Sequence, residues 1–318
     1  MKKNKFITKQ LTLKFWILKT KILKHIIPFY LDGFYKNEIT GYTLSTRNID
    51  CNEWFIEFKK TILVNMSTKY LPICRLSDGE YTFICGTQPP IKNNVIAHYI
   101  SNIKFSFNKL ISNGNLNAAT SKGISSGNYL KNEIDEQKSI YLENIKDISK
   151  NGILAMHLTY AEKPFQERFH YSISNIFKKN NIIINETNYY PFYFVYAYLQ
   201  TVEFFESIKN KNVLVITGAN DDKINIVNNY LIGKDVNFVS FYKISPNRSL
   251  YDNINLSDVM TVNFDICFIA AGIGKPNIIT QLKLLNCPCI DIGFMFEVWA
   301  NPEQAYNRPW CSKKYKTS

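Results

Sequence analysis

The chain has 318 residues, of which 46% are hydrophobic and 20% charged, and this composition excludes a disordered or fibrous protein. Lys and Arg number 38 against 26 Asp and Glu, and the resulting net charge of +12 favours anionic partners such as nucleic acid, anionic lipid or phosphorylated small molecules. Seven cysteines without a C-x-x-C pair and four scattered histidines favour reduced thiols in a cytoplasmic protein over disulfides or a zinc site.

The N-terminal segment, residues 1–47, is expected to be distinct from the main domain, residues 48–318. Its first 28 residues mix lysines with large apolar side chains, and no apolar run is long enough to span a membrane. On a helical projection Leu11, Phe15 and Leu18 share one sector, while lysines gather in another. The pattern predicts a basic amphipathic helix that either binds the inner face of an anionic membrane or packs on its own domain.

After this segment, apolar runs alternate with helical stretches. Asp50 is expected to cap a helix that presents Trp54, Phe55, Phe58 and Ile62 on one face. Further helices are expected at 222–231 and 276–285, and strands at 71–76, 116–120, 153–156, 182–184, 213–217, 236–241, 266–270 and 288–292. Strands buried on both faces and joined by helices predict an α/β fold with a doubly wound, mostly parallel, Rossmann-like sheet. The sheet would form one domain, or two lobes hinged near 185–193.

Ligands of such sheets bind beyond the carboxyl ends of the strands. The first candidate motif there is Arg75-Leu76-Ser77-Asp78-Gly79-Glu80. The carboxylates of Asp78 and Glu80 are the hard oxygen ligands that Mg²⁺ or Mn²⁺ prefers. Gly79 permits close backbone approach, and Arg75 could pair with a carboxylate or a phosphate.

Three later strand ends also carry candidate residues. Gly218 follows the strand at 213–217, and Gly272, Gly274 and Lys275 follow the strand at 266–270, so both turns could receive phosphates. The last strand ends in Asp291-Ile292-Gly293, with Glu297 just beyond it. Asp291 and Glu297 are the candidates for a catalytic base, with His157 as a third. The tyrosine-rich run at 189–193 could stack on a base or sugar, or belong to the core.

Taken in order, these motifs resemble those of the GT-D-fold glycosyltransferases, a bacterial-type family with an arginine-led D-x-E metal motif. Ser77 stands where that motif usually has glycine. The segment 264–299 looks like the family's closing segment, although Gly272-Ile273-Gly274 replaces a Gly-Pro-Thr-Ala-like turn and Phe294 stands where histidine is often seen.

The resemblance implies metal-dependent transfer of a sugar, of the hexosyltransferase class, from a nucleotide-sugar donor to a hydroxyl of a glycan or lipid-linked acceptor, as in polysaccharide biosynthesis. Asp78 and Glu80 would hold Mn²⁺ or Mg²⁺. The donor would lie against Arg75, Ser77, Gly79, Gly218, Gly272, Gly274 and Lys275.

Two other classes stay open. An S-adenosylmethionine-dependent or other nucleotide-cofactor Rossmann-type enzyme would use the strand and glycine turn at 213–220, although no acidic residue ends the next strand, 236–241. A nucleic-acid-binding protein would use the positive charge and the aromatic residues, but no helix-turn-helix, zinc-finger or RNA-recognition signature is present. Metal-independent binding of adenosyl ligands would favour the first, and steep salt dependence of binding the second.

Overall fold

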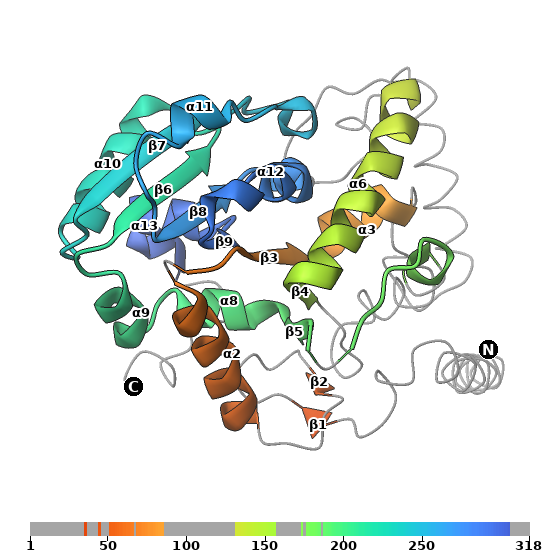
Figure 1. The fold of residues 1–318 in the computed structure, drawn as a ribbon, viewed down its shortest axis with the longest axis horizontal. Coiled ribbons are helices and arrows are strands. Elements are labelled where there is room, and N and C mark those ends of the chain that lie inside the picture. Colours follow the sequence, from red (N-terminus) through yellow and green to blue (C-terminus); the bar gives the residue numbers. More distant parts are fainter. Residues whose placement is uncertain are drawn as a thin grey trace, which may run out of the picture.

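The computed structural model describes residues 35–36, 44–45, 51–66, 68–85, 131–156, 173, 176–185 and 187–305. Seven strands form one parallel sheet in the order β5-β4-β3-β9-β8-β6-β7 (Figure 1). Their bounds are β3 (Leu71–Leu76), β4 (Ile153–Met156), β5 (Tyr189–Pro191), β6 (Asn212–Thr217), β7 (Phe238–Lys243), β8 (Ile266–Ala270) and β9 (Pro288–Asp291). A separate antiparallel pair consists of β1 (Tyr35–Lys36) and β2 (Leu44–Ser45). The sheet confirms the predicted parallel α/β architecture.

Helices cover both faces of this sheet, as Figure 1 shows. On one face α6 (Lys131–Asn151) and α12 (Lys275–Gln281) contact each other and β3. On the other face α8 (Phe192–Tyr198) contacts β3 and β4, and α2 (Cys51–Asn65) packs on α8. The remaining helices are α3 (Asp78–Cys85), α9 (Val202–Ser207), α10 (Asp221–Ile232), α11 (Leu256–Val259) and α13 (Met295–Ala300), with short 3-10 turns η2 (Ser249–Tyr251), η3 (Gly272–Gly274), η4 (Lys283–Leu285) and η5 (Pro302–Ala305).

The core follows from the apolar runs in the sequence. The side chains of β3, β4 and β9 are buried along their whole length, as expected for strands covered on both faces. Of the predicted face of helix α2, Trp54, Phe58 and Ile62 have no exposed surface, while Phe55 is only partly buried. The predicted helix at 276–285 is shorter than expected, because α12 ends at Gln281 and a 3-10 turn completes the segment.

One predicted strand is wrong and another is shifted. Residues 182–184 form no strand. The side-chain amide of Asn188 donates to the carbonyl oxygen of Ile183 in this segment at 2.8 Å and to that of Ser149 in α6 at 2.7 Å. The strand beside β4 is β5, which belongs to the same sheet as the rest, so the segment 185–193 is no hinge between lobes. Strand β7 begins at Phe238 rather than at 236, after a turn in which Asp235 has φ 62°. The strand expected at 116–120 lies outside the described residues.

The order of the strands determines where a ligand cleft is expected. Strand β6 connects through α10 to β7 on one side, while its neighbour β8 connects through α12 to β9 on the other. Adjacent strands whose connections run in opposite directions create a switch point, where α/β sheets bind ligands. Strand β9 pairs with β8 on one side and with β3 on the other, so the carboxyl ends of β8, β9 and β3 lie next to one another.

The predicted N-terminal amphipathic helix lies outside the described residues. None of the helices that the structure describes combines the length and the apolar character that crossing a membrane requires.

Candidate functional site

Arg75 on β3 and Asp291 on β9 form the centre of the site. The two strands pair in parallel, and the residues lie 216 positions apart in the sequence. Arg75 Nη2 donates to Asp291 Oδ1 at 2.7 Å, Arg75 Nε donates to the Asp291 carbonyl oxygen at 2.8 Å, and the Arg75 backbone N–H donates to Oδ2 at 3.1 Å. Both side chains are at most 2% exposed. The sheet thus joins the arginine-led motif to the Asp-Ile-Gly motif.

Aromatic rings and a glycine fix the guanidinium of Arg75. Its Cζ lies 4.0 Å from the ring centroid of Tyr196 and 5.1 Å from that of Phe192, two residues one turn apart on α8. Gly293 has φ 41°, and a Cβ there would lie 2.0 Å from Arg75 Nη2. The sequence analysis did not select Tyr196, because its helical spacing from Phe192 indicates only a shared helix face.

The substitution Gly293→Ala is expected to lower the free energy of unfolding by about 2–4 kcal/mol, since it combines overpacking against Arg75 with a strained φ. Gly233→Ala is the matched control, because Gly233 has φ −66° and its added Cβ would approach no closer than 3.2 Å to the Asn229 carbonyl oxygen. Urea denaturation measures both. Equal effects of the two substitutions would contradict the close contact with Arg75.

Lys275 and Glu80 complete a buried group of four charges, which we call the ion cluster: Arg75, Asp291, Lys275 and Glu80. Lys275, the first residue of α12, places its Nζ 2.8 Å from Glu80 Oε1 and 3.1 Å from Asp291 Oδ2. Lys275 is 5% exposed and Glu80 9%. Two cations and two anions balance, which is the condition for burying ionised groups.

The charges of the ion cluster stabilise one another. Burial by itself would raise the pKa of Asp291, but Arg75 and Lys275 outweigh it and hold this pKa below its ordinary value. Burial would likewise lower the pKa of Lys275, but Asp291 and Glu80 raise it above its ordinary value. Asp291 is therefore a carboxylate already bound by two cations. These contacts favour a positioning role for Asp291 over that of a base.

Glu80 has a second partner at the start of α3. Its Oε2 accepts the backbone N–H of Ser77 at 2.8 Å, the reciprocal contact of a capping box with the pattern S-x-x-E. The S-x-x-E pattern of Ser77 and Glu80 is visible in the sequence, and a capping box accounts for these two residues without any ligand. Ser77 thus supports Glu80 through its amide, and the two carboxylate oxygens of Glu80 have different partners.

The predicted metal pair is described only in part. The side chain of Asp78 lies outside the described residues, and within the described part of the chain no group of three His, Cys, Asp or Glu could hold a metal. Glu80 offers the hard carboxylate oxygen that Mg²⁺ or Mn²⁺ prefers. Glu80 Oε1 is the oxygen that would hold such a cation, but in this structure it contacts Lys275, so metal binding by Asp78 and Glu80 stays a prediction.

The glycines assigned to the donor have packing roles. A Cβ on Gly218 would lie 2.7 Å from Pro246 Cα, and one on Gly274 would lie 2.4 Å from the backbone of Ser249. Gly272 has φ 52°, a conformation that favours glycine. Gly79 lies half-buried in α3. The loop after β7 therefore packs on both phosphate-type turns, and the donor-binding role of these glycines stays a prediction.

Glu297 pairs with a residue outside the ion cluster. It is on α13 and pairs with Lys223 Nζ at 2.8 and 2.9 Å, with its side chain 40% exposed. His157 and the side chain of Tyr193 lie outside the described residues. Tyr189 and Tyr190 are at most 2% exposed and pack on Trp54, so these two belong to the core.

Tyr141 on α6 is a further residue that the sequence analysis did not select. Burial, followed by the negative charge of Glu80, raises the pKa of its hydroxyl well above the ordinary value. The hydroxyl is buried and makes no hydrogen bond within the described part of the chain. Its spacing on α6 would indicate only an apolar core position.

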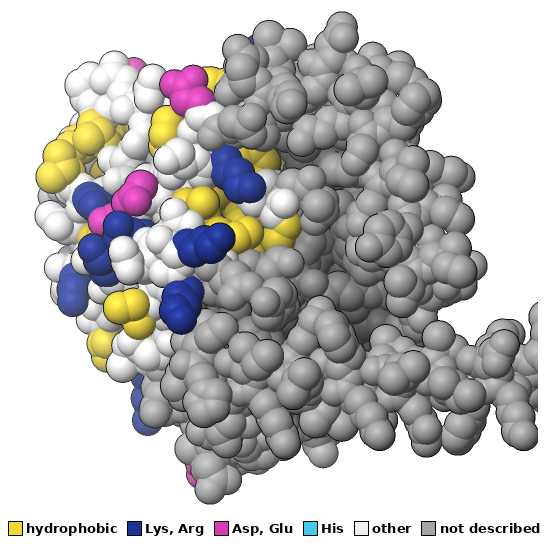
Figure 2. Space-filling view, turned by 90° about the vertical axis from the view of Figure 1, so that its right-hand side faces the viewer, with side chains coloured by type: hydrophobic (Ala, Val, Ile, Leu, Met, Phe, Trp, Pro, Cys, Tyr) yellow, Lys and Arg dark blue, Asp and Glu magenta, His cyan; other side chains and the backbone are white. Residues whose placement is uncertain are grey.

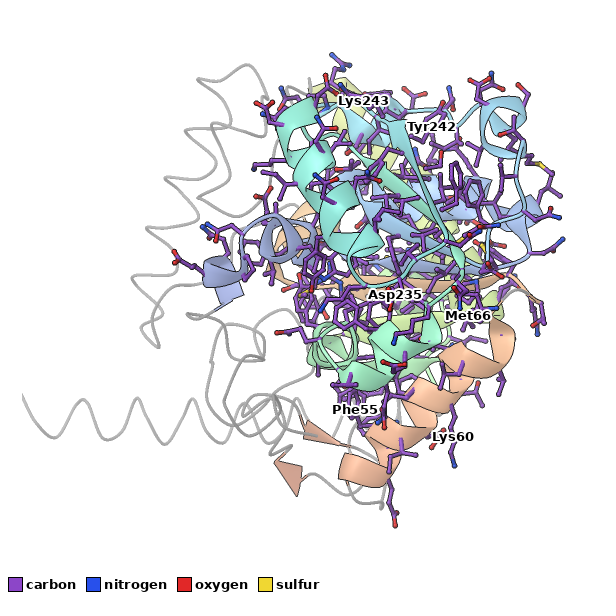
Figure 3. The ribbon with its side chains drawn as sticks, turned by 90° about the vertical axis from the view of Figure 1, so that its left-hand side faces the viewer. Phe55, Lys60, Met66, Asp235, Tyr242 and Lys243 are labelled. Carbon is purple, nitrogen blue, oxygen red and sulfur yellow. The ribbon has the colours of Figure 1, made fainter. Side chains whose placement is uncertain are left out.

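Basic side chains lie on the face at the carboxyl ends of the strands. Figure 2 views the molecule from the side toward which the β3 arrow points in Figure 1, and Lys and Arg side chains are spread over the described part of this face. Figure 3 shows Tyr242 and Lys243 at the carboxyl end of β7 and Asp235 at the other end. Positive charge here suits an anionic ligand.

No protein-family model matches the chain, and no curated protein sequence matches it. Among solved structures it is similar to domain of unknown function 1792, described as having a distinct glycosyltransferase fold, with 13% identity, a TM-score of 0.46, and coverage of 79% of this chain and 87% of the other. A selenomethionine-substituted structure of that domain is 15% identical with a TM-score of 0.42, covering 80% and 87%.

Proposed function

We propose that the chain is a glycosyltransferase, of the hexosyltransferase class, that moves a sugar from a nucleotide-sugar donor to a hydroxyl of a glycan or lipid-linked acceptor. The observation that carries the proposal is the ion cluster. It unites Arg75 and Glu80 of the arginine-led D-x-E motif with Asp291 of the Asp-Ile-Gly motif, the two parts of the sequence that resemble the GT-D family. Lys275 adds a buried ammonium between them.

The cluster suits the chemistry of this transfer. A leaving nucleoside diphosphate gains negative charge in the transition state, and fixed cations in a water-poor site stabilise that charge. Lys275 supplies one such cation, and Arg75 Nη1 is a buried donor that makes no hydrogen bond within the described part of the chain. Mn²⁺ or Mg²⁺ bound by Asp78 and Glu80 would supply Lewis-acid stabilisation of the same charge.

The acceptor needs a base that it can reach. Glu297 is our candidate, because it is 40% exposed and its partner Lys223 is 44% exposed, whereas Asp291 is 1% exposed and bound by the buried Arg75 and Lys275. We therefore assign Asp291 a positioning role. A lipid-linked acceptor would place the protein peripherally on the inner face of a membrane, where the basic N-terminal segment would bind anionic headgroups.

An S-adenosylmethionine-dependent enzyme has less support. An acidic residue at the end of the second strand would bind the ribose hydroxyls of its cofactor. Strand β7 ends instead at Lys243, which pairs with Asp221 at the start of α10. The same arrangement leaves a cation at this position, which suits a phosphate better than a ribose.

The proposal predicts release of nucleoside diphosphate from one member of a panel of nucleotide sugars in the presence of Mn²⁺ and an acceptor. Glu80→Gln and Asp78→Asn are each expected to lower turnover by about 10²–10³-fold, the usual effect of removing a group that stabilises transition-state charge. Lys146→Gln is the control, because its pair with Glu143 is on the surface of α6.

Mass spectrometry of the purified protein would identify a bound nucleotide sugar. Absence of binding and release with every donor would reject the proposal.

A further inference from the structure

Lys275 occupies the position at Glu80 that a metal ion would need. The Ser77 amide already takes Glu80 Oε2, so Oε1 is the oxygen open to a further cation. The ammonium of Lys275 lies 2.8 Å from that oxygen and is itself 5% exposed. In this state of the chain, the charge that a metal would neutralise on Glu80 is therefore already neutralised from within the protein.

A divalent cation and the ammonium of Lys275 cannot both remain at Oε1. Like charges a few Å apart repel strongly where water is excluded, and Lys275 Nζ is buried between two carboxylates. The rest of the ion cluster does not depend on the Lys275–Glu80 contact. Asp291 retains Arg75 at 2.7 Å, so loss of this one contact leaves the junction of β3 and β9 in place.

A diphosphate could draw the ammonium away from Glu80. Lysine carries its three donors on a flexible four-carbon stem, and it exchanges one oxygen partner for another without movement of the backbone. The basic side chains at the carboxyl end of the sheet favour such an anion. Arrival of the anion would then release Glu80 at the moment when a metal can also bind the phosphate oxygens.

We propose that Lys275 and a divalent cation compete for Glu80, and that the diphosphate of the donor ends the competition by binding Lys275. The competition between Lys275 and the cation concerns this chain's own residues, whereas the role of the donor's diphosphate rests on the proposed function. Two consequences follow. Mn²⁺ alone binds weakly, and Mn²⁺ and a nucleoside diphosphate strengthen each other's binding.

The test is titration of Mn²⁺ into the full chain, with free Mn²⁺ followed by electron paramagnetic resonance. Lys275→Met is expected to bind Mn²⁺ alone at least tenfold more tightly than the unchanged protein. The matched control is Lys283→Met, because Lys283 follows the same helix but pairs with Asp147 at the surface. The double variant Lys275→Met with Glu80→Gln should lose the gain, which assigns it to Glu80. Equal or weaker Mn²⁺ binding by Lys275→Met overturns the competition.

A second measurement uses the unchanged protein and does not depend on folding of the variant. Mn²⁺ is titrated with and without uridine diphosphate as the probe, and the Mn²⁺ that this nucleotide chelates in a protein-free titration is subtracted. The protein is then expected to bind Mn²⁺ at least tenfold more tightly with the probe, and equal affinity with and without it overturns the role of the diphosphate. A gain of Mn²⁺ affinity in Lys275→Met supports the competition even where no sugar transfer is found. Failure of the proposed function is thus distinguishable from failure of this inference.

Discussion

Replacing Asp291 by asparagine is expected to lower the free energy of unfolding by about 3–5 kcal/mol, the cost of leaving buried charges without their partner. Asparagine has nearly the same shape, so packing changes little. However, Arg75 loses its carboxylate, and Lys275 retains only Glu80. Urea denaturation measures the change, which should appear in the midpoint with the slope preserved.

Asp221→Asn is the control for this substitution. Asp221 also pairs with a cation at 2.8 Å, Lys243, but the two side chains are 77% and 56% exposed. Exposed pairs contribute about 0–1 kcal/mol, so this control should change stability little. A similar effect of the two substitutions would show that the ion cluster does not stabilise the sheet.

The difference in stability between the unchanged protein and Asp291→Asn should depend on pH. The pKa of Asp291 is lowered by folding, so its contribution is full above the unfolded value of about 3.9 and is lost as the pH falls through the folded value. The pKa of Lys275 is raised by folding, so its contribution is full below its unfolded value of about 10.4 and is lost as the pH rises through the folded value. The difference should thus be greatest between these two limits.

The sequence predicted the sheet more completely than the site. Strands β3, β4 and β8 have the predicted bounds, because each is a short apolar run that is buried between helices. The run at 182–184 has the same composition, yet it forms no strand, and the side-chain amide of Asn188 donates to the carbonyl oxygen of Ile183 within it. Local pattern cannot distinguish these cases, since this contact is made from outside the run.

The site was predicted as separate residues. Arg75, Asp291, Lys275 and Glu80 were each selected because they follow or end a strand or begin a helix. Their pairing depends on insertion of β9 beside β3, and the order of strands along the chain does not reveal that neighbourhood. For the same reason Asp291 was expected to act as a base, since its two cationic partners come from distant parts of the chain.

Arg75→Lys should also lower the free energy of unfolding markedly, by about 2–4 kcal/mol, although it preserves the charge. The guanidinium donates to both the carboxylate and the carbonyl oxygen of Asp291 while its plane lies against Tyr196. The ammonium of lysine lacks the planar fork that makes both donations in one fixed geometry, and it cannot lie flat against the Tyr196 ring.

A double-mutant cycle separates the stacking from the ion pair. Tyr196→Leu removes the ring together with the hydroxyl that hydrogen-bonds Arg75, and Tyr196→Phe, which removes the hydroxyl alone, separates the two contributions. The coupling energy between Arg75→Lys and Tyr196→Leu should be about 0.5–2 kcal/mol, the range of cation–π contacts that extends from exposed to desolvated sites. The pair of Lys234 with Tyr230, where the cation lies 5.6 Å from the ring centroid, is the comparison and should show less coupling. Additive effects at Arg75 and Tyr196 would mean that α8 covers the arginine without fixing it, and that its orientation depends on Asp291 and Gly293 alone.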